Sequence, residues 1–232
     1  MRRSRVYLGL SIISLAVAAL LGHVADRTHC PLRSSDCFMD CEQAPQDDAA
    51  REELYDHAIS GRHDEAIQIA ERLAARDVND TWATLYLAYA LRGAERTDES
   101  TERYSQALLL AEQQEDATAA IDALTGRAAC RLAGDDVAGA DRDLERAYEV
   151  ATRAENTRRS ECSAYQLACI HAQRAAVYAR LRSAVTADTE KQRAVRWLKL
   201  ARARGYDNMR HMRHDQDLGP LAGYSPYESL FD

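Results

Sequence analysis

Proline is absent between Pro45 and Pro220, and this gap constrains the fold more than any other feature of the chain. The intervening segment is rich in Ala, Leu, Arg, Glu and Gln, residues that favour helices. Proline removes a backbone donor and clashes with the preceding helical turn, so helices can form throughout this segment without interruption. Runs that alternate β-branched and polar residues, as strands require, are missing. The sequence therefore predicts an all-α fold.

The distribution of charge argues against one class of partner. The formal net charge is −7 over 232 residues, and acidic and basic residues are mixed along the chain without a basic stripe. A domain that binds nucleic acid usually carries a basic patch that neutralises phosphates. We therefore expect no nucleic-acid partner.

The first residues have the pattern of an export signal. A basic tip at residues 1–5 is followed by an apolar run at 6–25, which is long enough for a helix to cross a bilayer. Positive charge before the run predicts that the tip stays in the cytoplasm and that the rest of the chain is exported. The run is either an uncleaved transmembrane anchor or a signal peptide with a small-residue cleavage site at 16–18. We expect a single-pass protein of the cell membrane, with its C-terminal domain outside the cytoplasm, or else a secreted or periplasmic protein.

Half of the six cysteines lie in a linker at residues 26–48, directly after the apolar run. The linker cysteines are Cys30, Cys37 and Cys41. The helical block contains Cys130, Cys162 and Cys169. Since an exported chain can oxidise its thiols, we expect a disulfide within the linker or between the linker and the helical block. A metal site is the alternative use of the linker, although its spacings differ from those of paired-cysteine zinc sites.

The helical block repeats a motif that consists of a small residue, a second residue four positions later and a third after three more. The first two copies lie 34 residues apart, namely Ala66, Ala70 and Leu73, and then Ser100, Tyr104 and Ala107. Later copies follow at spacings of 40 and 54, namely Ala140, Leu144 and Ala147, and then Ala194, Leu198 and Ala201. The segment before the second copy carries Leu87, Ala88 and Leu91 on an expected helix. Gly61 lies in the expected loop before the first copy.

These motifs and the period of 34 resemble the tetratricopeptide repeat over roughly residues 49–205. The resemblance implies a solenoid of about four helical hairpins, because one hairpin cannot bury its apolar face alone. It predicts a repeat domain at residues 49–232, with an insertion at 173–191 that lengthens the first helix of the last repeat. No copy ends in the usual proline of the family, so the sequence does not define the boundaries of the third and fourth repeats.

The end of the chain, about residues 187–232, resembles the terminal unit of many bacterial tetratricopeptide proteins. The similarity starts upstream in the helix YQLACIH at 165–171 and includes an Asp-x-Asp-Leu-x2-Leu turn. The turn and the closing aromatic residue are formed by Asp215, Asp217, Leu218, Leu221 and Phe231. The resemblance predicts that Asp215 caps a short helix and that the leucines cover the end of the array.

The same stretch offers side chains that bind divalent metals, namely His211, His214, Asp215 and Asp217. As metal ligands they would have to converge on one point and be held there by outer hydrogen bonds. The alternative hypothesis for the function is therefore a metal- or redox-dependent envelope factor. It would use these four residues or the linker residues Cys30, Cys37 and Cys41.

The sequence contains no nucleotide loop, no His-Glu-x2-His helix and no Gly-x-Ser-x-Gly elbow, so we expect neither enzyme activity nor a cofactor. The resemblance implies instead that the concave face of the array binds a protein or peptide. The corresponding positions here are Tyr55, Trp82, Tyr86, Tyr89, Arg92 and Tyr165. Tyr, Trp and Arg often dominate binding energies, although the same rings could pack between helices. We predict a non-enzymatic interaction scaffold of the bacterial cell envelope.

Overall fold

The computed structural model describes residues 45–232, with side chains from residue 49, and every regular element in this range is helical. The long helices are α2 (Pro45–Ile59), α3 (His63–Arg76), α4 (Thr81–Gly93), α5 (Thr97–Gln113), α6 (Ala117–Ala133), α7 (Val137–Thr157), α8 (Glu161–Arg180) and α9 (Ala184–Ala203). Shorter elements follow, namely α10 (Met209–His214), the 3-10 helix η2 (Gln216–Leu221) and α11 (Ser225–Glu228). The predicted all-α fold is confirmed for this range. The basic tip, the apolar run and the linker cysteines lie outside the described residues.

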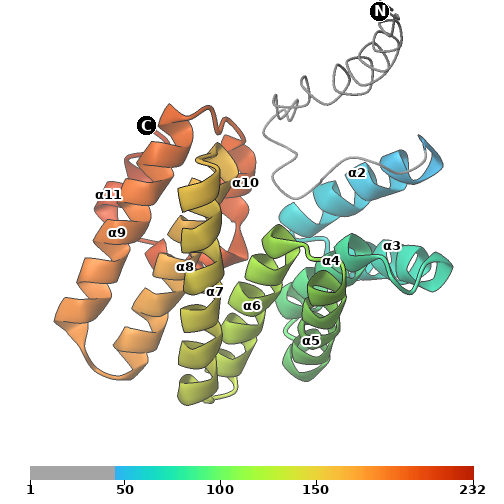
Figure 1. The fold of residues 1–232 in the computed structure, drawn as a ribbon, viewed down its shortest axis with the longest axis horizontal. Helices are drawn as coiled ribbons and strands as arrows, with labels where there is room; N and C mark the ends of the chain where they lie inside the picture. The colour runs from blue at the N-terminus through green and yellow to red at the C-terminus, as the bar shows by residue number, and fades with distance from the viewer. Residues whose placement is uncertain (1–44) are drawn as a thin grey trace, which may run out of the picture. The chain divides into compact units, whose positions relative to one another are not determined.

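The long helices pack in sequence order as the hairpins α2/α3, α4/α5, α6/α7 and α8/α9 (Figure 1). The first helices of neighbouring hairpins, α2, α4, α6 and α8, also contact each other in order. They form a continuous row, and we call the face of this row that points away from the second helices the inner face. None of the helices in the described part of the chain is long and apolar enough to cross a membrane.

The repeated motif lies on the second helices, and all of its residues are buried. Its first position is fully buried in Ala66, Ser100, Ala140 and Ala194. Ser100 Oγ donates a hydrogen bond of 2.8 Å to the carbonyl of Ala88 on the preceding helix. A small residue at this position therefore brings the two helices of a hairpin close together, as the motif predicts.

The longer spacings between later copies of the motif come from longer helices. Helices α3 and α4 have 14 and 13 residues, whereas α7 and α8 have 21 and 20. The predicted insertion at 173–191 is not a separate element. It comprises the end of α8, a turn and the start of α9, so the extra residues extend both helices of the last hairpin.

Several turns between the helices contain a residue in the left-handed conformation. Gly61 has φ 75° at the predicted loop position, and Glu95 has φ 61° at the equivalent position 34 residues later. The following N–H then bonds back across the helix end, as from Arg96 to the carbonyl of Leu91 at 2.9 Å. Glycine adopts this conformation without strain, whereas other residues adopt it at a cost. At Glu95 the backbone hydrogen bonds of the turn hold the chain in this conformation.

After α9 the chain turns at Gly205, with φ 114°, and returns across the inner face. Leu218 and Leu221 are buried in a cluster with residues of α8 and α9, so they cover the end of the array as predicted. The side chain of Asp215 accepts a hydrogen bond from the N–H of Asp217 at 2.9 Å and caps η2, which confirms its predicted role. Phe231 packs edge-on against Tyr227 at the same end.

Candidate functional site

The candidate site is the inner face, and residues 208–217 cover it. We call these residues the C-terminal segment. All six predicted groove residues lie on first helices: Tyr55 on α2, Trp82, Tyr86, Tyr89 and Arg92 on α4, and Tyr165 on α8. The structure brings them together by stacking the hairpins. Four of them, Tyr55, Tyr89, Arg92 and Tyr165, bond directly to the C-terminal segment.

Arg92 is the main charged contact between the inner face and the segment. Its Nη1 donates to Asp217 Oδ1 at 2.7 Å, and its Nε donates to Gln216 Oε1 at 2.9 Å. The side chains of Arg92 and Asp217 are only 11% and 14% exposed. Burial disfavours the charged guanidinium, but Asp217 together with the nearby Tyr104, Cys130 and Tyr89 outweighs this effect and raises the pKa of Arg92 well above its usual value. The pair is therefore a buried ion pair between distant parts of the chain.

Tyr89 recognises the backbone of the segment. Its hydroxyl accepts a hydrogen bond from the N–H of Gln216 at 3.2 Å and donates to the carbonyl of His214 at 3.5 Å. Gln173 on α8 donates from Nε2 to the carbonyl of Asp217 at 2.8 Å. Such contacts do not depend on the side chains of the bound segment, so this part of the inner face can hold a backbone turn of varied sequence.

Tyr55 holds the beginning of the segment. Its hydroxyl accepts a hydrogen bond from Asn208 Nδ2 at 2.7 Å, and its ring stacks on His211 with centroids 5.8 Å apart. Arg210 extends the contact along α2 by pairing with Asp56 at 2.9 Å. The segment thus spans the inner face from the first hairpin to the last.

Trp82 and Tyr86 lie next to each other in the row of aromatic side chains on α4. Their rings are 4.2 Å apart, and Tyr86 also meets Tyr55 edge-on at 6.2 Å. Arg51 covers the indole of Trp82 at 4.6 Å. These two residues support the position of Tyr55 by packing between helices.

Asp215 lies at the centre of a buried polar cluster. It accepts a hydrogen bond from Tyr165 Oη at 2.8 Å and lies 3.5 Å from His211 Nε2. Burial alone raises the pKa of Asp215, but the hydrogen bond and charge of His211, together with the contacts from Asp217 and Tyr165, lower it to about 2. The carboxylate is therefore ionised across the physiological range.

The predicted metal ligands do not converge. Asp217 points to Arg92, Asp215 is bonded to Tyr165, and His214 is exposed. Only His211 and Asp215 approach each other, at 3.5 Å. Within residues 45–232, no group of three or more His, Cys, Asp or Glu side chains is placed to hold a metal ion.

The cysteines of the described residues are of two kinds, disulfide-bonded and free. Cys162 is disulfide-bonded, whereas Cys130 and Cys169 are buried free thiols. Cys169 Sγ donates to Asp215 Oδ2 at 3.6 Å, and burial raises the pKa of this thiol well above its usual value. An activated thiol needs a base such as histidine as its direct partner, so Cys169 is placed as a packing residue.

The predicted set omitted one partly buried carboxyl group of the inner face, Asp122 on α6. Gln166 Nε2 donates to Asp122 Oδ1 at 3.0 Å, and burial raises the pKa of Asp122 well above its usual value. Asp122 lies 36 residues after Tyr86, which is also the offset between the helix-capping residues Asp80 and Asp116. Alignment of these two caps could therefore have placed Asp122 on the inner face.

Comparison with models of known protein families gives no match for this chain, and comparison with curated proteins gives none either.

Proposed function

We propose that the hairpins are tetratricopeptide repeats and that the protein is a non-enzymatic scaffold of the bacterial cell envelope. In this proposal the inner face binds a peptide segment of a partner protein, and the apolar run at 6–25 places the array at the membrane or exports it. One observation supports the proposal above the others: the inner face already holds a segment of the chain's own sequence, residues 208–217, through contacts to both backbone and side chains.

The contacts define the chemistry of the bound segment. Tyr89 and Gln173 bind backbone groups, so they accept many sequences. Arg92 selects a carboxylate, because an unpaired guanidinium in so buried a place would cost about 3–5 kcal/mol. A partner that occupies the inner face must therefore replace Asp217 with a carboxylate of its own. The C-terminal segment and the partner compete for the same side chains.

Competition can be measured with a labelled peptide that copies residues 208–221. Fluorescence anisotropy would follow its binding to the full-length protein, to a Gln216→Ala/Asp217→Ala variant and to Arg92→Ala. We expect the double variant to bind the peptide more tightly than the wild type, because its own segment is held more weakly, and Arg92→Ala to bind it least. Equal binding by all three proteins would contradict the proposal.

Arg127→Ala is a matched control for Arg92→Ala. Arg127 on α6 forms a similarly buried ion pair with Asp143 at 2.7 Å, but this pair joins the two helices of one hairpin. Both substitutions remove a buried cation, so both should lower stability. Only Arg92→Ala should change peptide binding if the inner face is the binding site.

A further inference from the structure

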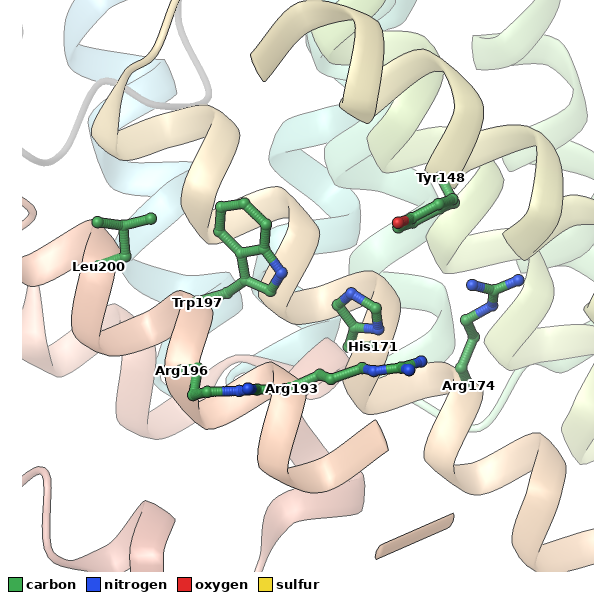
Figure 2. Close-up of a pocket in the computed structure, with 7 residues that line it drawn as sticks. All are labelled: Tyr148, His171, Arg174, Arg193, Arg196, Trp197 and Leu200. Atoms are coloured by element: carbon green, nitrogen blue, oxygen red, sulfur yellow. The ribbon is translucent and has the colours of Figure 1, made fainter. Parts of the chain in front are cut away.

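A pocket of about 510 Å³ lies between α7, α8 and α9, separate from the inner face. It is lined by Tyr148, His171, Arg174, Arg193, Arg196, Trp197 and Leu200. In Figure 2 the imidazole of His171 lies between the rings of Trp197 and Tyr148, and guanidinium groups surround it. The volume falls within the range of ligand-binding pockets in proteins.

The pocket and the inner face are on different sides of α8. Tyr165, Cys169 and Gln173 recur every four residues and contact the C-terminal segment. At 3.6 residues per turn, His171 and Arg174 fall on the opposite side of the helix, and both line the pocket. Binding in the pocket therefore does not require displacement of the C-terminal segment.

The lining has an excess of positive charge, although the whole chain carries a net charge of −7. Three arginines line the pocket. Two of them have carboxylate partners, since Arg174 pairs with Glu145 and Arg193 pairs with Glu190. Arg196 forms no ion pair with any residue that the structure describes, so its guanidinium is available to a ligand.

Two further donors favour an anionic ligand. Arg174 Nε is buried without a hydrogen-bond partner among residues 45–232, while its guanidinium lies 5.0 Å from the centre of the Tyr148 ring. Arg193 is 45% exposed and uses Nη1 for Glu190, and its other nitrogens form no hydrogen bond within residues 45–232. A carboxylate can accept two parallel bonds from one guanidinium, which makes it a fitting partner for this lining.

The remaining lining is apolar and aromatic. Trp197 is partly buried and packs against the helices on both sides, and Leu200 is 36% exposed. His171 is held rigidly beneath them, because its Nδ1 lies 2.6 Å from Glu190 Oε2 in a buried pair. The pocket thus places fixed apolar surface next to guanidinium groups.

We propose that this pocket binds an acidic peptide segment of a partner protein, with a carboxylate at Arg196 and Arg193 and an adjacent aromatic or aliphatic side chain on Trp197 and Leu200. Tryptophan and arginine are the residues that most often anchor such segments. The site adds a second point of attachment to the one on the inner face, and it is independent of that proposal.

A fluorescein-labelled peptide of alternating Glu and Phe, flanked by Gly and Ser, is the probe. Its binding to the full-length protein in detergent would be followed by fluorescence anisotropy. We expect saturable binding that weakens at least about tenfold in Arg196→Ala and in Trp197→Ala, as for residues at the centre of an interface. Arg196 is exposed, so Arg196→Ala should not disturb the fold. This variant therefore tests the proposal even if Trp197→Ala unfolds the protein.

Matched controls separate this pocket from other surfaces. Arg72→Ala removes an exposed arginine on α3, far from the lining residues, and should leave binding unchanged. Tyr89→Phe, which removes a hydroxyl of the inner face, should also leave it unchanged, whereas an altered affinity in that variant would place the probe on the inner face and overturn the proposal. A Gln-Phe peptide that binds as tightly as the Glu-Phe peptide would overturn it too. If phenylacetate displaces the probe at an equal concentration, the pocket binds a small carboxylic acid, and the proposal of a peptide ligand is overturned.

Discussion

Arg92 and Asp217 are 125 positions apart in the sequence, yet their side chains form a buried ion pair of 2.7 Å. The pair joins the second hairpin to the turn that closes the array. It shows how the inner face is organised: the side chains expected to hold a partner hold the chain's own C-terminal segment. A partner can bind at these side chains only when this contact opens.

Loss of one member of this pair should destabilise the fold strongly. We predict that Arg92→Ala lowers the free energy of unfolding by about 3–5 kcal/mol, because Asp217 is left buried without its cation. Denaturant unfolding followed by circular dichroism measures this change. Arg96→Ala is the control, since Arg96 pairs with Glu99 on the exposed surface, and its unfolding midpoint should not move. Equal effects in the two variants would show that the Arg92 pair contributes no more than a surface pair.

Asp215 should make stability depend on pH in the acid range. Its pKa is lowered from 3.8 to about 2 in the folded protein. A lowered carboxyl pKa stabilises the fold above the unfolded value, and this contribution is lost as the pH falls from about 4 to 2, by roughly 2 kcal/mol. Asp215→Asn keeps a capping side chain but does not titrate. Its stability should therefore fall less over this range than that of the wild type.

Asp217 also titrates in the acid range, and it affects stability in the opposite direction to Asp215. Burial raises the pKa of Asp217, and the nearby Asp215 adds to this effect, although Arg92 opposes it. A raised carboxyl pKa favours the folded state as the pH falls. Comparison of Asp217→Asn with the double variant Asp215→Asn/Asp217→Asn removes the titration of Asp217, so their difference reports on Asp215. Parallel pH profiles would show that the His211 and Tyr165 contacts do not hold its charge.

Gly126 should not tolerate a side chain, although it lies inside α6. A Cβ atom there would overlap the ring of Tyr104 from the neighbouring helix. Alanine improves helix propensity by about 1 kcal/mol, but overpacking of a buried contact costs about 1–3 kcal/mol. We predict a lower thermal midpoint for Gly126→Ala. Gly134→Ala is the control, because its Cβ would meet only ordinary contacts at 3.6 and 3.7 Å. A midpoint in Gly126→Ala at or above that of Gly134→Ala would contradict the packing described here.

The oxidised protein should contain a bond from Cys162 to the linker. Cys162 is disulfide-bonded, and the other thiols of the described residues, Cys130 and Cys169, are free. We therefore predict that its partner is Cys30, Cys37 or Cys41. Peptide mapping without reduction should show one such linked pair, with Cys130 and Cys169 alkylated only after unfolding. Alkylation of Cys162 in the native, oxidised protein would refute this.

The local features of the fold were predictable from the sequence. The small residues Ala66, Ser100, Ala140 and Ala194 identified the second helices, because only small side chains allow close packing at that position. Asp215 identified the closing turn, since a capping aspartate acts on its immediate neighbours. These are short-range effects, and a motif of a few residues contains them.

The long-range contacts were not predictable in the same way. The sequence placed Tyr55, Tyr89 and Arg92 on one face, but nothing in their spacing indicates that residues 208–217 cover it. That contact depends on the summed lengths of several helices, and the second helices lengthen from 14 residues in α3 to 17 in α5 and 21 in α7. The α7–α9 pocket has the same origin, because Tyr148 and Trp197 meet only after the hairpins have stacked.

The central claim is that the inner face binds a partner in competition with the C-terminal segment. Photocrosslinking in intact membranes tests it most directly, with a photoreactive phenylalanine analogue in place of Tyr89. We predict crosslinks both to the C-terminal segment and to a separate polypeptide, with the second product increased by Asp217→Ala. The same analogue at Leu109, which is 55% exposed on α5, should not yield that polypeptide. Crosslinks from position 89 that remain within the chain, in both wild type and Asp217→Ala, would contradict the account.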